Sequence, residues 1–101
     1  MAGIPTIRET DMNMMFGVVM PKTGAQTVLI EGMPAAMKFR SQVLPHPGPI
    51  PPIHPPNPIM KGDMTVLVEG MPLAFIGVPD ACLHLMTLVG SKTVLTSGTM
   101  G

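Results

Sequence analysis

The 101-residue sequence contains no tryptophan and no tyrosine, and aromatic residues account for only 3% of it. Charged residues make up 12%, and the formal net charge is +0. Proteins that bind nucleic acid need a basic excess to contact phosphates or aromatic rings to stack on bases, so this class of partner is excluded on composition. Hydrophobic residues nevertheless make up 46%, which excludes a disordered chain and predicts an unusually apolar surface that contacts a partner.

Long uninterrupted segments are also missing. Eleven glycines and 13 prolines divide the chain, and the longest stretch free of both runs from Thr6 to Phe16. Interior proline and glycine break helices, so long helices and coiled coils are excluded, and no apolar run approaches the ~20 residues of a spanning helix. The start of the chain has no basic region followed by an apolar stretch, so we expect no signal peptide. The single cysteine, Cys82, rules out an internal disulfide.

One pattern, G-x-x-T-V-L-x-x-G, occurs three times, beginning at Gly24, Gly62 and Gly90. The first two copies continue into Met-Pro-x-Ala, whereas the third lacks this proline segment, so the repeat motifs span 24–36, 62–74 and 90–98. Thr-Val-Leu predicts a short strand in each copy. We expect the first glycine to adopt a positive φ in a tight turn, and the Glu-Gly or Ser-Gly after the strand to reverse a hairpin.

Because one hairpin is too small to be stable alone, three copies are expected to share one core around a common axis. The predicted fold is all-β: one domain over 1–101 of short hairpins in three pseudo-symmetric repeats, with little or no helix. The apolar strand residues are candidates for the core or for a contact surface, and the pattern does not separate the two. They are Val28, Leu29, Val66, Leu67, Val94 and Leu95.

A proline-rich stretch, residues 45–58, interrupts the repeats. It has eight prolines in fourteen residues, and it accounts for the ten extra residues between the first and second copies. Such a tract is typical of polyproline II and could serve as a ligand for an aromatic-lined groove. Its place inside a repeat array favours a stiff excursion that carries two histidines to one place.

Those histidines belong to a set of four potential metal ligands, His46, His54, Cys82 and His84. Three imidazoles and one thiolate suit a closed tetrahedral zinc site. A small domain with few aromatic residues has a small core, and a metal cross-link would stabilise its fold. The alternative is a small buried cysteine and solvated loop histidines, since neither His-x7-His nor Cys-x-His is a standard finger spacing.

Twelve methionines leave room for a second metal hypothesis. Thioethers select Cu(I), so a small copper- or zinc-binding protein with a Met-rich surface is the alternative function. The residues concerned are Met12, Met14, Met15 and Met20. Core and contact packing is the simpler role for these side chains, and no tight M-x-x-M repeat occurs.

Catalytic patterns are missing. Glu31 and Glu69 occupy equivalent repeat positions, which lie far apart in a pseudo-three-fold body and cannot form an acid–base dyad. No phosphate loop, G-x-S-x-G elbow or H-E-x-x-H segment occurs. A Cys82 nucleophile would lack an evident orienting residue, so we expect no enzyme and no small-molecule substrate.

The motif G-x-x-T-V-L-x-x-G-M-P-A-A, its second copy and the late Cys/His pair resemble the PAAR-repeat proteins. The resemblance implies a small cone of β-hairpins whose base caps a trimeric β-helical spike in type VI secretion systems, contractile phage tails and related injection machines. It implies that the point passes transiently through a target membrane, with a structural zinc near the apex held by His46, His54, Cys82 and His84. Any effector would be carried non-covalently.

The sequence departs from that pattern in two ways. Met37 stands where an arginine usually completes the motif, and Cys82 lies closer to His84 than the usual Cys/His spacing. These departures indicate a divergent, more apolar member. It is expected to be made in the cytoplasm and to act at the tip of an injection apparatus or virion tail.

Overall fold

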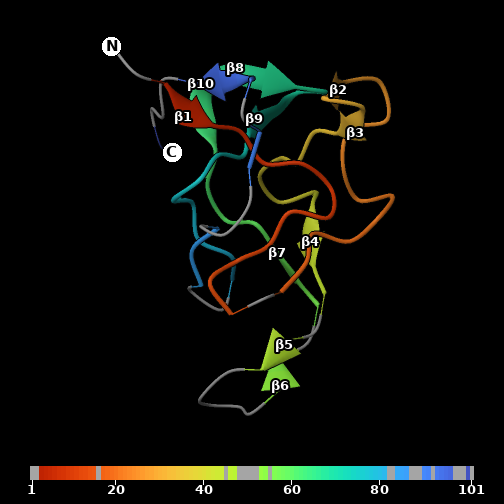
Figure 1. Ribbon diagram of the computed structural model, residues 1–101, viewed down its shortest axis with the longest axis vertical. Helices are drawn as coiled ribbons and strands as arrows, with labels where there is room; N and C mark the ends of the chain where they lie inside the picture. The colour runs from red at the N-terminus through yellow and green to blue at the C-terminus, as the bar shows by residue number, and fades with distance from the viewer. Residues whose placement is uncertain are drawn as a thin grey trace.

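The computed structural model describes residues 3–15, 17–44, 46–47, 53–54, 56–81, 84–86, 90–91, 93–96 and 100, with the backbone alone for 46, 47, 53 and 54. Within these residues the secondary structure consists of antiparallel strand pairs and contains no helix (Figure 1). The fold is therefore all-β, as predicted. The strands are β1 (Ile4–Pro5), β2 (Leu29–Ile30), β3 (Met33–Pro34), β4 (Gln42–Val43), β5 (His46–Pro47), β6 (Ile53–His54), β7 (Asn57–Pro58), β8 (Asp63–Val68), β9 (Met71–Leu73) and β10 (Leu95–Thr96).

The first two repeats form β-hairpins. β2 pairs with β3 so that Leu29 opposes Pro34, and β8 pairs with β9 so that Leu67 opposes Pro72. Both turns consist of Glu-Gly with two positive φ angles, 52° and 84° in the first and 49° and 85° in the second. Such a pair of angles is the type I′ turn, which matches the twist of the flanking strands. Glu-Gly therefore reverses each hairpin, as the sequence predicted.

The third repeat is completed by the beginning of the chain. β10 pairs with β1 so that Leu95 opposes Pro5 and Thr96 opposes Ile4. This register repeats that of the two hairpins, with Ile4–Pro5 taking the place of β3 and β9. The third copy is not followed by a proline segment in the sequence, and Gly3-Ile4-Pro5 takes the place of that segment from the other end of the chain.

A closed ring of three backbone hydrogen bonds joins the repeats. The N–H of Ile7 donates to the carbonyl of Ala74 (3.0 Å), that of Ala74 to Ala36 (2.9 Å), and that of Ala36 to Ile7 (2.9 Å). Each residue stands two positions after its repeat's proline, and all three are fully buried. The pseudo-three-fold axis therefore passes through this ring.

Three arms extend from the ring toward the other end of the molecule (Figure 1). They are the first arm (11–19), the middle arm (41–59) and the third arm (78–86), so the middle arm is ten residues longer than the others. A residue with positive φ precedes each arm, and its N–H donates to the carbonyl of the arm's last residue. These pairs are Thr10 (φ 75°) with Val19, Phe39 (φ 68°) with Ile59, and Gly77 (φ 107°) with Met86.

The middle arm is a long hairpin. Val43 opposes Asn57 in the β4–β7 ladder, and His46 opposes His54 in the β5–β6 ladder, which keeps the same register three rungs farther out. Figure 1 shows β5 and β6 at the narrow end of the long axis, in a molecule of 37 × 28 × 21 Å. In its described rungs the proline tract is thus a paired excursion, as predicted, and not a free polyproline II ligand.

The core lies under the ring, where the roots of the arms meet. Its largest fully buried side chain is Phe75, which packs with Ile7, Val19 and Ile59. A second cluster between the first two repeats contains Met37. The apolar strand ends and arm roots therefore share one interior, which no single hairpin could form.

The first glycine of each repeat has a role different from the predicted one. Neither Gly24 nor Gly62 has a positive φ. A Cβ atom at Gly62 would lie 2.7 Å from the Pro72 carbonyl oxygen, and one at Gly24 would lie 2.8 Å from that of Ala35. The expectation of a positive φ was wrong, because these positions require the absence of a side chain where two backbones approach.

Candidate functional site

The six apolar strand residues left undecided by the sequence all lie on the surface. The three valines are 36–38% exposed, and the three leucines are 50–62% exposed. The residue after each leucine is buried: Ile30, Val68 and Thr96 are 4–7% exposed. These exposed residues form what we call the base, and they are Val28, Leu29, Val66, Leu67, Val94 and Leu95.

The base carries the symmetry of the ring. Each of its leucines opposes a proline in the same register, Pro34, Pro72 or Pro5. The three strand pairs β2–β3, β8–β9 and β1–β10 lie together at the end of the long axis opposite β5 and β6 (Figure 1). The result is an apolar surface of three equivalent parts, of the kind that marks a protein–protein contact.

Polar contacts close the junctions between neighbouring repeats. At the junction of the second repeat with the first, the Glu69 carboxylate accepts hydrogen bonds from the Thr27 hydroxyl (2.7 Å) and the Thr27 N–H (2.8 Å), and it pairs with Arg40. The Thr27 hydroxyl, then its N–H, then Arg40 hold the pKa of Glu69 below its ordinary value of 4.5. Arg40 is the extra residue between Phe39 and Ser41, where the other two arms have none.

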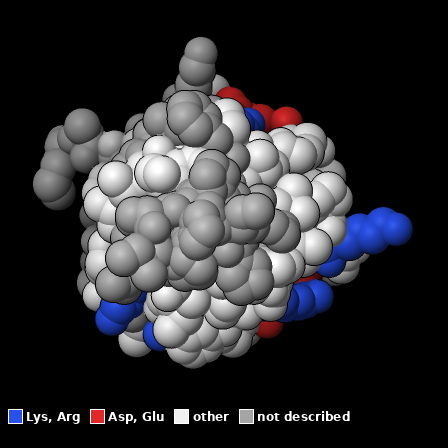
Figure 2. All heavy atoms as spheres, turned by 90° about the horizontal axis from the view of Figure 1, so that it is seen from below, with Lys and Arg blue, Asp and Glu red and all other residues white. Residues whose placement is uncertain are grey.

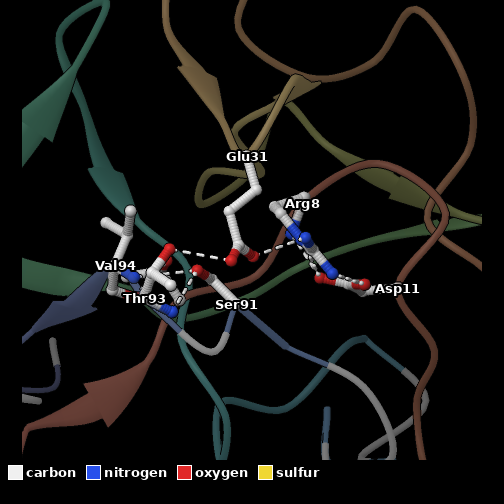
Figure 3. A network of polar contacts seen from close by, with 7 residues as sticks. Arg8, Asp11, Glu31, Ser91, Thr93 and Val94 are labelled. Atoms are coloured by element: carbon white, nitrogen blue, oxygen red, sulfur yellow. Dashed lines mark hydrogen bonds and ion pairs between the residues drawn. The ribbon is translucent and has the colours of Figure 1, made fainter.

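The junction of the first repeat with the third follows the same plan (Figure 3). Glu31 accepts from the Thr93 hydroxyl (2.7 Å) and pairs with Arg8 (2.8 Å). Arg8 also contacts buried Asp11 through two side-chain nitrogens at 3.0 Å. The hydrogen bond with Asp11 raises the pKa of Arg8 above its ordinary value. One arginine thus ties the first strand, the first arm and the first hairpin turn together.

The third junction is built differently. Asp63 is fully buried and accepts from the Thr96 hydroxyl, and its other oxygen accepts from the Thr65 N–H (2.9 Å) and hydroxyl (2.6 Å). The position equivalent to Glu31 is Ser97, which lies outside the described residues. The carboxylate at this junction therefore belongs to β8 of the second repeat, whereas at the other two junctions the carboxylate belongs to a hairpin turn.

At the narrow end, the backbone brings two predicted metal ligands together. His46 and His54 are Cα partners on the β5–β6 ladder. Their side chains lie outside the part of the chain that the structure describes, as does Cys82. Within the described residues no three His, Cys, Asp or Glu side chains are grouped as a metal site.

His84, the fourth predicted ligand, is buried in the third arm. Its N–H donates to a carboxylate oxygen of Asp80 (3.1 Å), and the other Asp80 oxygen accepts from the Asn13 side chain (2.8 Å). Ala81 donates to the Pro58 carbonyl (2.9 Å), so this arm lies beside β7 of the middle arm. The Asp80–His84 loop, which contains Cys82 in sequence, is therefore held against the hairpin that carries the other two histidines.

The acidic residues do not form a catalytic pair. Glu31 and Glu69 are engaged at separate junctions with different arginines. In the part of the chain that the structure describes, no cavity is found and no helix is long and apolar enough to span a membrane. Of the methionines considered for copper, Met12, Met14 and Met15 lie on the first arm and Met20 follows it, all partly or largely exposed.

The sequence reasoning missed the functional part played by the first strand. Gly3-Ile4-Pro5 matches Gly32-Met33-Pro34 and Gly70-Met71-Pro72 in spacing and residue type. This signal lies at the opposite end of the chain from the third repeat that it completes.

Two comparisons with known proteins complete these observations. The family description "PAAR motif" matches residues 9–84, about three quarters of the chain. A search of curated proteins found none that matches the sequence.

Proposed function

Because the chain belongs to the PAAR motif family, we propose that it is a non-enzymatic tip protein that caps a trimeric β-helical spike. The family is a structural one and is associated with the spike tips of injection systems. The observation that supports the finer proposal is the base, where the same Val–Leu pair is exposed three times around one axis. Each strand pair can face one chain of a true three-fold trimer.

The remainder of the molecule suits such a role. The ring of buried hydrogen bonds fixes the three parts of the base relative to one another. The middle arm extends away from the base, and prolines limit its backbone freedom. A tip of this kind would meet a target membrane only in passing and would carry any effector non-covalently.

The capping proposal is tested by mixing the protein with a trimeric β-helical spike and measuring co-elution in size-exclusion chromatography. We expect one tip per trimer. Leu67→Glu places a charge in the apolar contact and should weaken binding by about thirtyfold or more, the effect of a central contact residue. Met14→Glu is the matched control, because Met14 is 48% exposed but lies on the first arm. Failure of the folded proteins to co-elute, or equal losses in both variants, would contradict capping.

We further propose that the narrow end holds a structural zinc through His46, His54, Cys82 and His84. The donor set fits, since three imidazoles and a thiolate fill a tetrahedral site. The pairing of His46 with His54 and the packing of the Asp80–His84 loop against β7 support this. Zinc would cross-link two arms that lie side by side, stiffening the end farthest from the base.

Metal content of the untagged protein, purified without added metal, tests the zinc proposal. We expect about one zinc per chain, lost on His54→Ala or Cys82→Ala and kept in the control Met12→Ala. Copper in place of zinc, lost on replacing the methionines, would support the alternative of a small copper-handling protein. No metal in a folded protein would remove the site and leave the capping proposal to stand on spike binding.

A further inference from the structure

The formal neutrality of the chain conceals an uneven distribution of charge. Four of the six acidic residues are buried, at 0–5% exposure, whereas none of the five described cations is buried. The buried acids are Glu9, Asp11, Asp63 and Asp80. The described surface therefore has an excess of positive charge that the net charge of +0 does not reveal.

The buried carboxylates are engaged by the fold itself. Glu9 accepts from the Gly24 N–H (2.9 Å), Asp63 serves the third junction, and Asp80 joins the first and third arms through Asn13. Ionised groups are retained in an interior when hydrogen bonds compensate the loss of water. These acids are thus structural, and Asp11 alone among them pairs with a described cation, Arg8.

Most of the exposed cations lie around the root of the middle arm. Lys38 and Arg40 flank Phe39, just before the arm, and Lys61 follows its last residue, Ile59, by two positions. Lys22 joins them because its neighbour Thr23 accepts a hydrogen bond from Ser41. Figure 2, viewed from the narrow end, shows most of the blue side chains at the right and along the lower edge, with a few red atoms beside the lower-right group and the largest red group at the top.

These cations are largely uncompensated. Within the described residues, ion pairs involve only Arg8 and Arg40, so Lys22, Lys38 and Lys61 have no carboxylate partner there. Two exposed apolar side chains lie among them in the sequence: Phe39, next to Lys38, is 50% exposed, and Met60, next to Lys61, is 36% exposed. We call Lys22, Lys38, Phe39, Arg40, Met60 and Lys61 the cationic wall.

Phe39 is fixed in an unusual conformation. Its φ of 68° is rare for a bulky side chain, and the hydrogen bond from its N–H to Ile59 (2.7 Å) holds it there. The Lys38 ammonium lies 4.7 Å from the centre of its ring. The equivalent positions of the other repeats have Thr10 and Gly77, so only this corner presents an aromatic ring with a cation above it.

We propose that the cationic wall is the docking site for an acidic protein surface that also presents an apolar side chain. Charge complementarity selects a partner rich in carboxylates, and exposed Phe39 and Met60 provide an apolar contact. A bilayer would surround a passing tip on all sides, whereas the wall occupies one side. Nucleic acid binding is disfavoured because Phe39 is the only exposed ring among the described residues. The wall is separate from the base, so this inference does not depend on spike capping.

The experiment uses the full-length protein and two polymer probes of defined chemistry, poly-L-glutamate and a random glutamate–tyrosine copolymer. Binding is measured by fluorescence anisotropy of labelled polymer at several salt concentrations. We expect salt-sensitive binding to both polymers and tighter binding to the copolymer. Lys22→Glu/Lys38→Glu/Lys61→Glu should weaken binding at least tenfold, and Phe39→Ala should abolish the preference for the copolymer.

Controls separate the wall from general charge and from misfolding. Lys38→Glu and Lys92→Glu each make one Lys→Glu change, the first within the wall and the second in the third repeat; Lys38→Glu should weaken binding, and Lys92→Glu should alter it less than twofold. A cooperative thermal unfolding transition and a circular dichroism spectrum like those of the wild type show that the triple variant is folded, without reference to spike binding. The proposal is overturned if neither polymer binds, if the triple variant binds as well as the wild type, or if vesicles of phosphatidylserine and phosphatidylcholine bind more tightly than both polymers.

Discussion

In the ring, the three repeats keep one backbone register down to individual hydrogen bonds. The arms repeat one register only at their roots, in the pairs Met12–Val18, Gln42–Pro58 and Pro79–Leu85, and the middle arm then extends beyond the other two. The ring residues Ile7, Ala36 and Ala74 are interchangeable in geometry. The middle arm, by contrast, is ten residues longer than its neighbours and contains most of the chain's prolines. The repeats are thus alike at the base, where a symmetric partner is proposed to dock. They differ at the narrow end, which the middle arm alone forms.

The largest expected effect comes from making the arms alike. Deleting residues 45–54 leaves the middle arm with the nine-residue length of the other two and removes His46 and His54. We expect complete loss of bound metal with unchanged spike binding, because the base does not involve this segment. Metal analysis, co-elution and amide hydrogen exchange at Ile7, Ala36 and Ala74 check both parts. Loss of protection at these three amides would show that the ring depends on the arm.

A substitution in the shared core comes next. Phe75→Ala should lower the free energy of unfolding by about 3–5 kcal/mol, the usual result of truncating a buried phenylalanine. Phe75 lies directly under the ring and is 2% exposed. Phe39→Ala is the matched control and should cost less than about 1 kcal/mol, since that ring is exposed. Chemical denaturation measures both, and similar losses would mean that the wall and the core are not energetically distinct.

A smaller effect on stability is expected from replacing the polar contact of the third junction by the apolar contact found at another junction. Asp63→Ala leaves the Thr96 hydroxyl without its acceptor and should cost about 1–3 kcal/mol. The junction of the second repeat with the first has Ala25 and Val68 at the equivalent positions, in one apolar cluster. The double variant Asp63→Ala/Thr96→Val therefore copies the apolar packing of that junction and should recover part of the loss in denaturant melts. A double variant less stable than Asp63→Ala would show that the two junctions are not interchangeable here.

The smallest expected effect is on the stability of the protein at acid pH. The folded-state pKa of Glu69 is lowered, so its stabilising contribution is present above its ordinary value of 4.5 and is lost as the pH falls through the lowered value. Glu69→Gln should remove this part of the acid sensitivity, seen as a flatter melting temperature below about pH 4.5. Thr27→Val removes the strongest cause of the shift and should act in the same direction. An unchanged acid profile in both variants would contradict the assignment.

Local rules were sufficient to predict the hairpins. Thr-Val-Leu followed by Glu-Gly specifies a strand and a turn from neighbouring residues alone. The exposure of Leu29 was not predictable in this way, because each strand has an outer and an inner position, and only the packing of three repeats decides which is which. The role of Gly62 depends likewise on the Pro72 carbonyl, which no local pattern identifies.

The site was predictable in part for the same reason. His46 and His54 were expected to lie together on the proline excursion, and the backbone pairs them. The zinc itself and the part played by Cys82 stay predictions. The cationic wall was out of reach, because a count of charges cannot show that Asp63 and Asp80 point inward while Lys38 and Lys61 remain outside.

The pairing of β1 with β10 has a consequence for how the protein is made. The Thr6 hydroxyl donates to the Val94 carbonyl across 88 positions of the sequence, so the ring closes through contacts between the first and last strands. Contacts between residues far apart in sequence slow folding, because a long loop must close before they form. A ribosome-bound chain has its first strand exposed long before its last one is synthesised. We therefore expect folding to be completed only after β10 has left the ribosome, with the apolar edges of the first two hairpins open until that moment.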